Sequence, residues 1–519
     1  MNIGRLLTDT ALHYPGHDAV RWGGQRLSYR ELDDRVNSLA AALTNLGLST
    51  GDRIGFVMWN RPELLEVLFA AFKLGLCVVP LNARFNSAEL VYHLDDPKAV
   101  AIVHGPEFRD DVEKALDRTP SVMHVISLDQ ARPAAAQAAV HDYEDLIAFH
   151  PDAPDAAVDV SPDHLCWLFY TSGTTGRPKG AMLTHGNLMF VMVGWVADLM
   201  PLKPEDVTLH AAPLTHGAGF HALAAIAKGS TNLIPEKAAF DTEATLELIE
   251  REGVTNTWLV PTQVNRLVQS PALADRDLSR LHSIVYGGAP FHVEDLKVAV
   301  ERLGPVLVQV YGQGETPMTA TYLRQEEHAL GDPAVEARLA SAGCSRTGME
   351  VRLVDEDDNP VPAGELGEIV VRGPAVMSGY WERPDESART LRGGWLHTGD
   401  IGKLDERGYL YVLDRLKDLI ITGGANVYAR EVEEVLIQHP EVAAVTVIGI
   451  PDRDWGERVV AVVVPAEGTE PEDGALIDYC GRHLASYKKP KQVHVVPSLP
   501  VSAYGKVLKR ELREQFADA

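Results

Sequence analysis

The chain has 519 residues, of which 45% are hydrophobic and 23% charged, as in ordinary globular proteins, and its length favours two or more domains. Its 73 acidic and 48 basic residues give a formal net charge of −25. This charge argues against nucleic acid or an anionic membrane as the main partner, because both bind basic surfaces.

The N-terminal residues lack the apolar core of a signal peptide, and no uncharged apolar run approaches the ~18 residues of a membrane span. We therefore expect a cytoplasmic protein without a transmembrane segment. The four cysteines lie far apart and form no CxxC pair, so they predict buried thiols rather than a zinc site or a disulfide framework: Cys77, Cys166, Cys344 and Cys480.

Helical and strand-like segments alternate along the first 340 residues. Helical spacing of apolar residues marks 28–48 and 62–74, and short apolar strands follow each of them at 53–58 and 77–80. Further strands are expected at 99–103, 122–127, 164–170, 254–260, 283–286 and 306–310. This alternation predicts a large domain of layered α/β sheets with largely parallel strands.

After residue 340 the pattern changes to short strands separated by turns. Strands at 351–355, 367–372 and 409–413 predict a β-rich subdomain. A helix at 431–438, strands at 442–450 and 458–465, a helix at 474–485 and a strand at 492–496 then predict a small α+β domain. We expect an N-terminal domain over 1–414, a hinge at 415–419 and a C-terminal domain over 420–519.

The stretch Tyr170–Gly180 reads Tyr-Thr-Ser-Gly-Thr-Thr-Gly-Arg-Pro-Lys-Gly and follows an apolar strand. Its glycines let backbone N–H groups turn toward an anion, its hydroxyls add donors, and Lys179 adds a positive charge. It is not a Walker A loop, because Lys179 is followed by Gly180 and not by Ser or Thr. A polyphosphate site is one interpretation, and a polar surface loop is the other.

Two further motifs follow expected strands. Tyr311-Gly312-Gln313-Gly314-Glu315 offers an aromatic ring that can stack on a base and a carboxylate that can hold Mg²⁺, although a plain β-turn is the better explanation of this motif taken alone. Gly287-Gly288-Ala289-Pro290 has the small residues that let a flat base approach the backbone, or that form a tight turn.

Four more segments carry polar groups whose context decides their meaning. His216, within Pro213–Phe220, is best explained as a buried core histidine when taken alone. Asp400 ends the stretch Trp395-Leu396-His397-Thr398-Gly399-Asp400. The charged segment 414–418 precedes Gly423 and Gly424, and Gly505-Lys506 lies in a basic C-terminal segment.

Taken in order, these motifs closely resemble those of the adenylate-forming superfamily, which includes the acyl- and aryl-CoA synthetases. The resemblance extends from about residue 28 to residue 510. It implies phosphate binding by Thr171, Ser172, Gly173, Thr174, Thr175, Gly176 and Lys179. It implies adenine and ribose binding by Gly288, Ala289, Pro290, Tyr311, Gly312, Gln313, Asp400 and Arg415.

The resemblance also implies the catalytic roles. Lys506 is carried over as the adenylation lysine, Glu315 as the Mg²⁺ contact and His216 as the residue beside the acyl carboxylate. Lys417 is implied as the hinge of the small domain, with Gly423 and Gly424 lining the passage for CoA. Three positions depart from the usual pattern: Gly314 replaces threonine, Ala425 replaces glutamate, and Tyr504 replaces serine or threonine.

The implied reaction uses ATP, Mg²⁺ and CoA: a carboxylate attacks ATP to give acyl-AMP and pyrophosphate, and CoA then displaces AMP. The acyl pocket is expected around Gly217, Phe220 and Met318, and no Phe-Asp pair for an amino group occurs in 213–220. This favours a hydrophobic acid, either aliphatic or aromatic. A stand-alone enzyme that loads a carrier protein and a catalytically silent nucleotide-binding relative stay open, and so does a homodimer.

Overall fold

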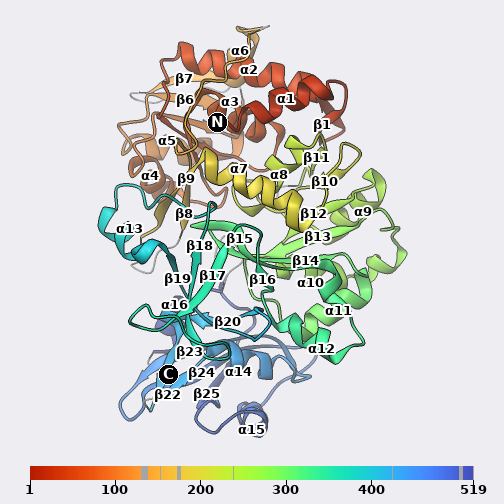
Figure 1. Cartoon of the computed structure of the whole chain (residues 1–519), viewed down its shortest axis with the longest axis vertical. Coiled ribbons are helices and arrows are strands. Elements are labelled where there is room, and N and C mark those ends of the chain that lie inside the picture. The colour runs from red at the N-terminus through yellow and green to blue at the C-terminus, as the bar shows by residue number, and fades with distance from the viewer. Residues whose placement is uncertain are drawn as a thin grey trace.

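The computed structural model describes residues 1–129, 138–151, 153–171, 177–237, 239–423, 425–501 and 507–517. These residues form four β-sheets with helices packed around them. The two larger sheets belong to the first 345 residues, a smaller antiparallel sheet follows, and the fourth sheet lies at the C-terminal end of the molecule (Figure 1).

The first sheet has seven strands in the order β7-β6-β5-β3-β4-β8-β9. All neighbours are parallel except the last pair, an antiparallel hairpin that places Thr171 opposite Lys179. The described residues on either side of the predicted phosphate loop, Thr171 and Lys179, therefore face each other in the hairpin at the edge of the sheet. The strands are β3 (Arg53–Val57), β4 (Cys77–Pro80), β5 (Ala101–His104), β6 (His124–Ser127), β7 (Ala139–Asp142), β8 (Leu165–Thr171) and β9 (Lys179–Thr184).

The second sheet has nine strands in the order β16-β15-β14-β13-β12-β10-β11-β1-β2. Its five central pairings are parallel, and the pairings β1–β2, β14–β15 and β15–β16 are antiparallel. The strands are β1 (Asp18–Trp22), β2 (Gln25–Ser28), β10 (Val207–Leu209), β11 (Thr231–Ile234), β12 (Asn256–Leu259), β13 (Ser283–Gly287), β14 (Leu307–Gln313), β15 (Thr316–Leu323) and β16 (Cys344–Ser345).

Helices cover both large sheets and bury an apolar core. α3 is buried along nearly its whole length, which explains its continuous apolar sequence; Pro62 opens its first turn and Gly75, with φ of +66°, ends it. α7 continues into a π-helical turn at Trp195–Leu199. The helices of this part are α1 (Arg5–His13), α2 (Tyr29–Asn45), α3 (Pro62–Leu74), α4 (Ser87–Asp95), α5 (Arg109–Leu116), α6 (Tyr143–Ala148), α7 (His185–Gly194), α8 (Gly217–Ala227), α9 (Thr242–Glu252), α10 (Pro261–Gln269), α11 (Val293–Leu303) and α12 (Pro333–Glu336).

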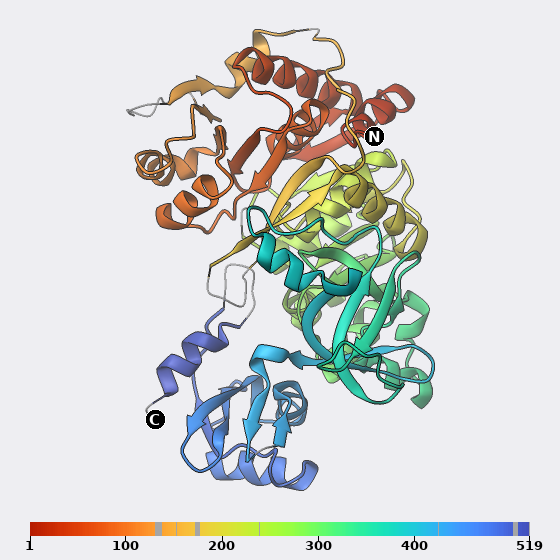
Figure 2. The same ribbon diagram turned by 60° about the vertical axis from the view of Figure 1, so that its left-hand side comes forward.

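The two remaining sheets confirm the predicted β-rich and α+β parts. An antiparallel sheet contains β17 (Glu350–Val354), β18 (Leu366–Arg372), β19 (Leu396–Leu404) and β20 (Leu410–Arg415), with α13 (Pro384–Thr390) beside it. The fourth sheet and its helices lie at the bottom of Figure 2. They comprise β21 (Ile420–Thr422), β22 (Ala425–Val427), β23 (Val442–Asp452), β24 (Gly456–Pro465), β25 (Gln492–Val495), α14 (Ala429–Leu436), α15 (Asp473–His483) and α16 (Lys509–Phe516).

The sheets change between Arg415, where β20 ends, and Ile420, where β21 begins. We therefore propose that the predicted segment 415–419 joins the two parts of the chain. Among the described residues, no helix combines the length and apolar character that crossing a membrane requires.

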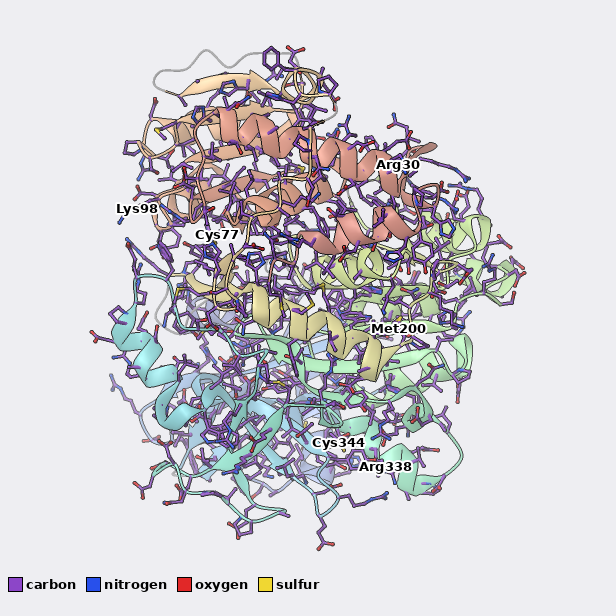
Figure 3. All side chains as sticks on the ribbon, turned by 45° about the horizontal axis from the view of Figure 1, so that its top comes forward. Arg30, Cys77, Lys98, Met200, Arg338 and Cys344 are labelled. Carbon is purple, nitrogen blue, oxygen red and sulfur yellow. The ribbon has the colours of Figure 1, made fainter. Side chains whose placement is uncertain are left out.

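The cysteines behave largely as predicted. Cys77, Cys166 and Cys480 are buried thiols, and Cys344 is half-buried. Cys77 lies in the upper part of the molecule and Cys344 lies near Arg338 in the lower part (Figure 3). The β-turn considered for Tyr311–Glu315 is present at Gly314 and Glu315, between β14, which extends through Gln313, and β15.

Candidate active site

Glu315 lies where the β8–β9 hairpin meets the β14–β15 hairpin. The Thr171 hydroxyl donates a hydrogen bond of 2.8 Å to Glu315 Oε1, and the Tyr380 hydroxyl donates another of 2.8 Å to the same oxygen. Burial, reinforced by the charge of Glu315, raises the pKa of Tyr380, so this phenol remains a donor at neutral pH. The carboxylate is 7% exposed and is therefore held in one orientation.

Lys179 begins β9 directly after the predicted phosphate loop. Its Nζ lies 2.9 Å from Glu386 Oε1, and it also lies 5.2 Å from the centre of the Tyr380 ring. β8 and β9 pair Lys179 directly with Thr171. Residues 172–176, with the predicted phosphate ligands Ser172, Gly173, Thr174, Thr175 and Gly176, lie outside the described residues.

Asp400 forms the second centre of the site. The Tyr311 hydroxyl donates a 2.7 Å hydrogen bond to Asp400 Oδ2, and Gln313 Nε2 donates one of 2.8 Å to the same atom. Arg415 Nε lies 3.3 Å from Oδ1, because β19 and β20 pair Asp400 with Arg415. Burial and the charge of Asp400 raise the pKa of Tyr311 well above its ordinary value. The sequence motifs predicted these four residues together, and the fold places them in contact.

The glycine positions of the site are explained by their close neighbours. A Cβ at Gly312 would lie 2.5 Å from the Thr316 carbonyl oxygen and 2.6 Å from the Met318 nitrogen, so no side chain fits there. A Cβ at Gly314 would lie 2.3 Å from Thr171 Cγ2 and 2.6 Å from Phe169 Cδ1. The space that a threonine would need at position 314 is therefore filled by the β8 strand end.

The predicted adenine-side turn follows β13. Gly288 is exposed and has φ of +81°, a conformation that glycine adopts without steric cost. Ala289 is half-buried and Pro290 is exposed. All three lie at the carboxyl end of β13, next to the strand that carries Tyr311.

His216 precedes α8 and lies beside the site. Its ring meets the Phe169 ring edge-on, with centroids 5.4 Å apart, and its Nδ1 lies 3.0 Å from Thr215 Oγ1. A small pocket lined in part by Phe169, Tyr170, Thr215 and His216 adjoins it. His216 is half-buried, which argues against its interpretation as a fully buried core histidine.

The residues predicted to line the acyl pocket are Gly217, Phe220 and Met318. Phe220 is buried against Trp167 and Phe169. A Cβ at Gly217 would lie 2.8 Å from Trp258, so the room that this glycine leaves is filled by an indole ring. Met318 has φ of +54°, a rare conformation for a side-chain-bearing residue; its carbonyl accepts a 2.8 Å hydrogen bond from Arg346 Nη1.

The C-terminal site residues are only partly described. Lys506 and Gly424 lie outside the described residues, and the side chain of Lys417 is likewise not described. Gly423 is exposed, has φ of +58°, and has the Trp455 ring beside it, 2.9 Å from where a Cβ would stand.

The donor set suits Mg²⁺ held together with phosphates rather than by a protein cage. Within the described residues, both hydrogen bonds to Glu315 reach Oε1, and no group of three or more His, Cys, Asp or Glu side chains could hold a metal. Mg²⁺ prefers oxygen ligands and is commonly bound by one or two carboxylates plus substrate phosphates. Glu315 fits that requirement.

Two residues of the site were missed by sequence reasoning. Tyr380 and Glu386 lie between the recognised motifs and carry no pattern of their own, yet they contact Glu315 and Lys179. The available sequence signal was weak: a glycine precedes Tyr380-Trp381. In the structure Tyr380 pairs with Ala181 of β9, and Trp381 N donates to the Gly180 carbonyl.

Comparison with known proteins agrees with this geometry. Residues 7–381 match the family described as AMP-binding enzyme, and residues 431–506 match the family described as AMP-binding enzyme C-terminal domain. Feruloyl-CoA synthase of Amycolatopsis sp is 40% identical over 504 residues, which cover 97% of this chain and 96% of that protein. The medium/long-chain-fatty-acid–CoA ligase FadD8 of Mycobacterium tuberculosis is 35% identical, covering 99% of this chain and 90% of that protein. The crystal structure of ATP-bound MatB from Rhodopseudomonas palustris superimposes with a TM-score of 0.89 at 32% identity, over 100% of this chain and 99% of that chain.

Proposed function

Since the chain belongs to the AMP-binding enzyme family, and within it to the AMP-forming acid–CoA ligases, we propose that it activates a hydrophobic carboxylic acid as acyl-AMP and transfers the acyl group to CoA. One observation carries the proposal. Three motifs that are far apart in the sequence, on strands of three different sheets, bring Thr171 into contact with Glu315 and Tyr311 into contact with Asp400.

In this proposal Asp400, supported by Arg415, binds the ribose hydroxyls, and Tyr311 with residues 288–290 holds the adenine. Thr171 and Lys179, with the loop between them, bind the pyrophosphate end of ATP. Mg²⁺, when bound at Glu315, supplies positive charge beside the phosphates. The protein thereby stabilises charge and positions two anions for in-line attack, which are the main tasks in phosphoryl-type transfers.

The acid is proposed to lie between His216, Phe220 and Met318, with His216 beside its carboxylate. The aromatic rings of Phe169, Trp258 and Phe220 surround this position and favour an uncharged tail. Relatives named for ferulate and for medium- and long-chain fatty acids support both an aromatic and an aliphatic acid.

Lys506 is proposed to bridge the acid carboxylate and the α-phosphate in the first half-reaction alone. We expect Lys506→Ala to lower acid-dependent pyrophosphate release by about 100-fold or more, because one positive charge at a developing anion is worth several kcal/mol. Thioester formation from preformed acyl-AMP and CoA should be retained. Equal loss of both half-reactions would contradict this role.

A second measurement identifies the molecule that accepts the acyl group. Consumption of free CoA in step with AMP release distinguishes a CoA ligase from an enzyme that loads a carrier protein. ATP binding without pyrophosphate release on a broad panel of aliphatic and aromatic acids would identify a catalytically silent relative.

A further inference from the structure

Glu386 belongs to α13, which lies close to β9 (Figure 1). Backbone hydrogen bonds join residues 378–381 to residues 180–182 of β9, and α13 begins directly afterwards, at Pro384. Because β9 starts at Lys179, this pairing brings the first turn of α13 to the lysine. The approach of Glu386 to Lys179 is therefore set by the backbone and not only by two long side chains.

Side-chain contacts hold the first turn of α13 in this position. Ser387 Oγ accepts a 2.8 Å hydrogen bond from Tyr380 N and donates one of 2.7 Å to the Arg383 carbonyl. Arg383 Nη2 donates at 2.6 Å to Asp96 Oδ1, beyond the end of α4. Glu386, which precedes Ser387 in the chain, is thus attached both to β9 and to the first sheet region.

The Glu386–Lys179 ion pair is shielded from solvent. Glu386 Oε1 lies 2.9 Å from Lys179 Nζ, and the two side chains are 19% and 11% exposed. Water and salt weaken exposed pairs strongly, whereas a shielded pair keeps more of its attraction. The charge of Glu386 also acts on Tyr380, which contacts both Lys179 and Glu315: burial, the contact with Glu315 and the charge of Glu386 raise the pKa of Tyr380.

Lys179 can contact Glu386 and a phosphate group at the same time. An ammonium group carries three N–H donors, and Glu386 Oε1 accepts from one side. The carboxylate offsets part of the lysine charge. A polyphosphate near Lys179 is therefore attracted less strongly than it would be by a lysine without a counter-ion.

A moderated attraction suits a site that must release pyrophosphate in every turnover. In the proposed reaction Lys179 meets the same phosphates twice, first as part of ATP and then as the leaving product. Attraction that acts equally on substrate and product lowers KM without raising kcat, and slow product release limits many enzymes. A counter-ion at Lys179 reduces this uniform attraction while keeping the ammonium group in place.

We propose that Glu386 is a positioning residue that orients Lys179 and offsets its charge, and thereby limits how tightly the site retains pyrophosphate. The inference rests on the proposed acid–CoA ligase function, in which Lys179 binds the pyrophosphate end of ATP. Glu386 acts through the lysine and sets the affinity for the β- and γ-phosphates without contacting them.

The test measures the dissociation constants of MgATP, pyrophosphate and AMP by calorimetry at saturating Mg²⁺. Glu386→Gln keeps an oxygen that accepts a hydrogen bond from Lys179 but removes the charge, so we expect MgATP and pyrophosphate to bind about fivefold more tightly. AMP lacks the β- and γ-phosphates, and its unchanged affinity would show that the variant is folded with an intact nucleotide site. Loss of a merely structural contact would weaken binding, which is the opposite sign.

Two controls isolate the contact with Lys179. Asp385→Asn removes the same charge one residue earlier on α13, where the side chain is exposed, and it should leave all three dissociation constants unchanged. The second control is a double-mutant cycle. In a Lys179→Met background, Glu386→Gln should no longer tighten the binding of pyrophosphate, because its effect passes through the lysine.

The outcomes separate the two proposals. Equal or weaker binding of pyrophosphate by Glu386→Gln, or an equal gain in Asp385→Asn or in the Lys179→Met background, overturns the role of Glu386 and leaves the ligase function standing. Absence of both MgATP binding and acid-dependent pyrophosphate release in the wild type, across aromatic and aliphatic acids, overturns the ligase function itself.

Discussion

At position 314 the chain carries glycine where the resembling family usually has threonine, and the neighbouring side chains explain the difference. Thr171 and Phe169, at the end of β8, occupy the volume that a side chain at 314 would need. Thr171 in turn holds Glu315 by a hydrogen bond. A side chain at 314 therefore competes with the group that orients the proposed Mg²⁺ ligand.

This packing predicts that adding a single methyl group at position 314 destabilises the fold. Gly314→Ala should lower the free energy of unfolding by about 1–3 kcal/mol, because the new Cβ forces Thr171 and Phe169 to move. Pyrophosphate release should fall with it. Urea unfolding measures the first effect. The matched control is Gly474→Ala in α15, where no atom lies within 4 Å of the new Cβ and a gain of up to about 1 kcal/mol is expected. Equal stability of both variants would contradict the packing argument.

The sequence motifs located most of the candidate site at the residue scale. Tyr311 and Gln313 come from one motif, Asp400 from a second and Arg415 from a third, and they meet as expected. The row formed by Asn232, Thr208, Asn256 and Ser283 was not predicted, because each of these residues lies in a different strand. Their alignment depends on strand register, which is a property of the folded sheet rather than of any one segment.

At the scale of elements, α2 and α3 are joined by a buried lysine. Lys73 is fully buried, and its Nζ lies 2.7 Å from Asp33 Oδ1, 2.6 Å from Asn37 Oδ1 and 3.0 Å from Asp155 Oδ1. The cation thus links two helices to the chain segment that leads into β8. A buried ion pair is costly to break because removing one partner leaves a desolvated charge behind.

We therefore expect Lys73→Met to lower the free energy of unfolding by about 3–5 kcal/mol, since it leaves Asp33 without its cation. Arg251→Ala serves as the control, because the Arg251–Glu247 pair is more than half exposed on both sides and such pairs are worth at most about 1 kcal/mol. Denaturant unfolding measures both. If Lys73→Met lowers the free energy of unfolding by less than 1 kcal/mol, the contacts of Lys73 with Asp33, Asn37 and Asp155 do not stabilise the fold.

Local sequence patterns predicted the bounds of helices and strands well where clear sequence signals delimit them. α3 and β4 begin and end at the predicted residues, because proline, glycine and a continuous apolar run delimit them. The partners of strands were less predictable. β1 pairs with β11, more than 200 residues later, and β9 and β15 pair antiparallel with β8 and β14 at the edges of otherwise parallel sheets. These pairings depend on tertiary packing, which single-segment periodicity does not contain.

At the scale of the whole molecule, an ion pair connects the two sides of the proposed hinge. His292, before α11, places Nδ1 3.3 Å from Glu434 Oε1 on α14, and Arg430 Nε lies 3.5 Å from the same oxygen. Arg430 also donates to the Val412 carbonyl. Glu433 and Asp295 are the other charged groups that act on His292. Rotation of the C-terminal part about residues 415–419 would break this pair.

The strength of the His292–Glu434 ion pair depends on pH, and the pKa shifts of the two residues give the direction of that dependence. Burial acts to lower the pKa of His292, but the close contact with Glu434 and its charge outweigh burial and raise the pKa above 6.5. Burial acts to raise the pKa of Glu434, and His292 outweighs it, so that pKa falls below 4.5. The stabilisation that protonated His292 gives to the contact is therefore complete below pH 6.5. It is lost as the pH rises through the raised pKa of His292. The glutamate contribution is complete above pH 4.5 and is lost at more acidic pH.

We accordingly expect the contact to be strongest between pH 4.5 and 6.5 and to weaken toward pH 8.5. Hydrogen exchange of the α14 amides, corrected for the intrinsic pH dependence of exchange, should show protection falling about fivefold over that rise, equivalent to about 1 kcal/mol. His292→Gln keeps a polar side chain but cannot gain a proton, so its α14 protection should be low throughout and independent of pH in this range. His282→Gln is the matched control: His282 is half-exposed and pairs with Asp206 in the nine-stranded sheet region, away from α14. Should wild type and His292→Gln show the same pH profile, the pair does not hold the C-terminal part in place, and the rotation would have to be opposed by the contacts of Arg430 and Asp414 instead.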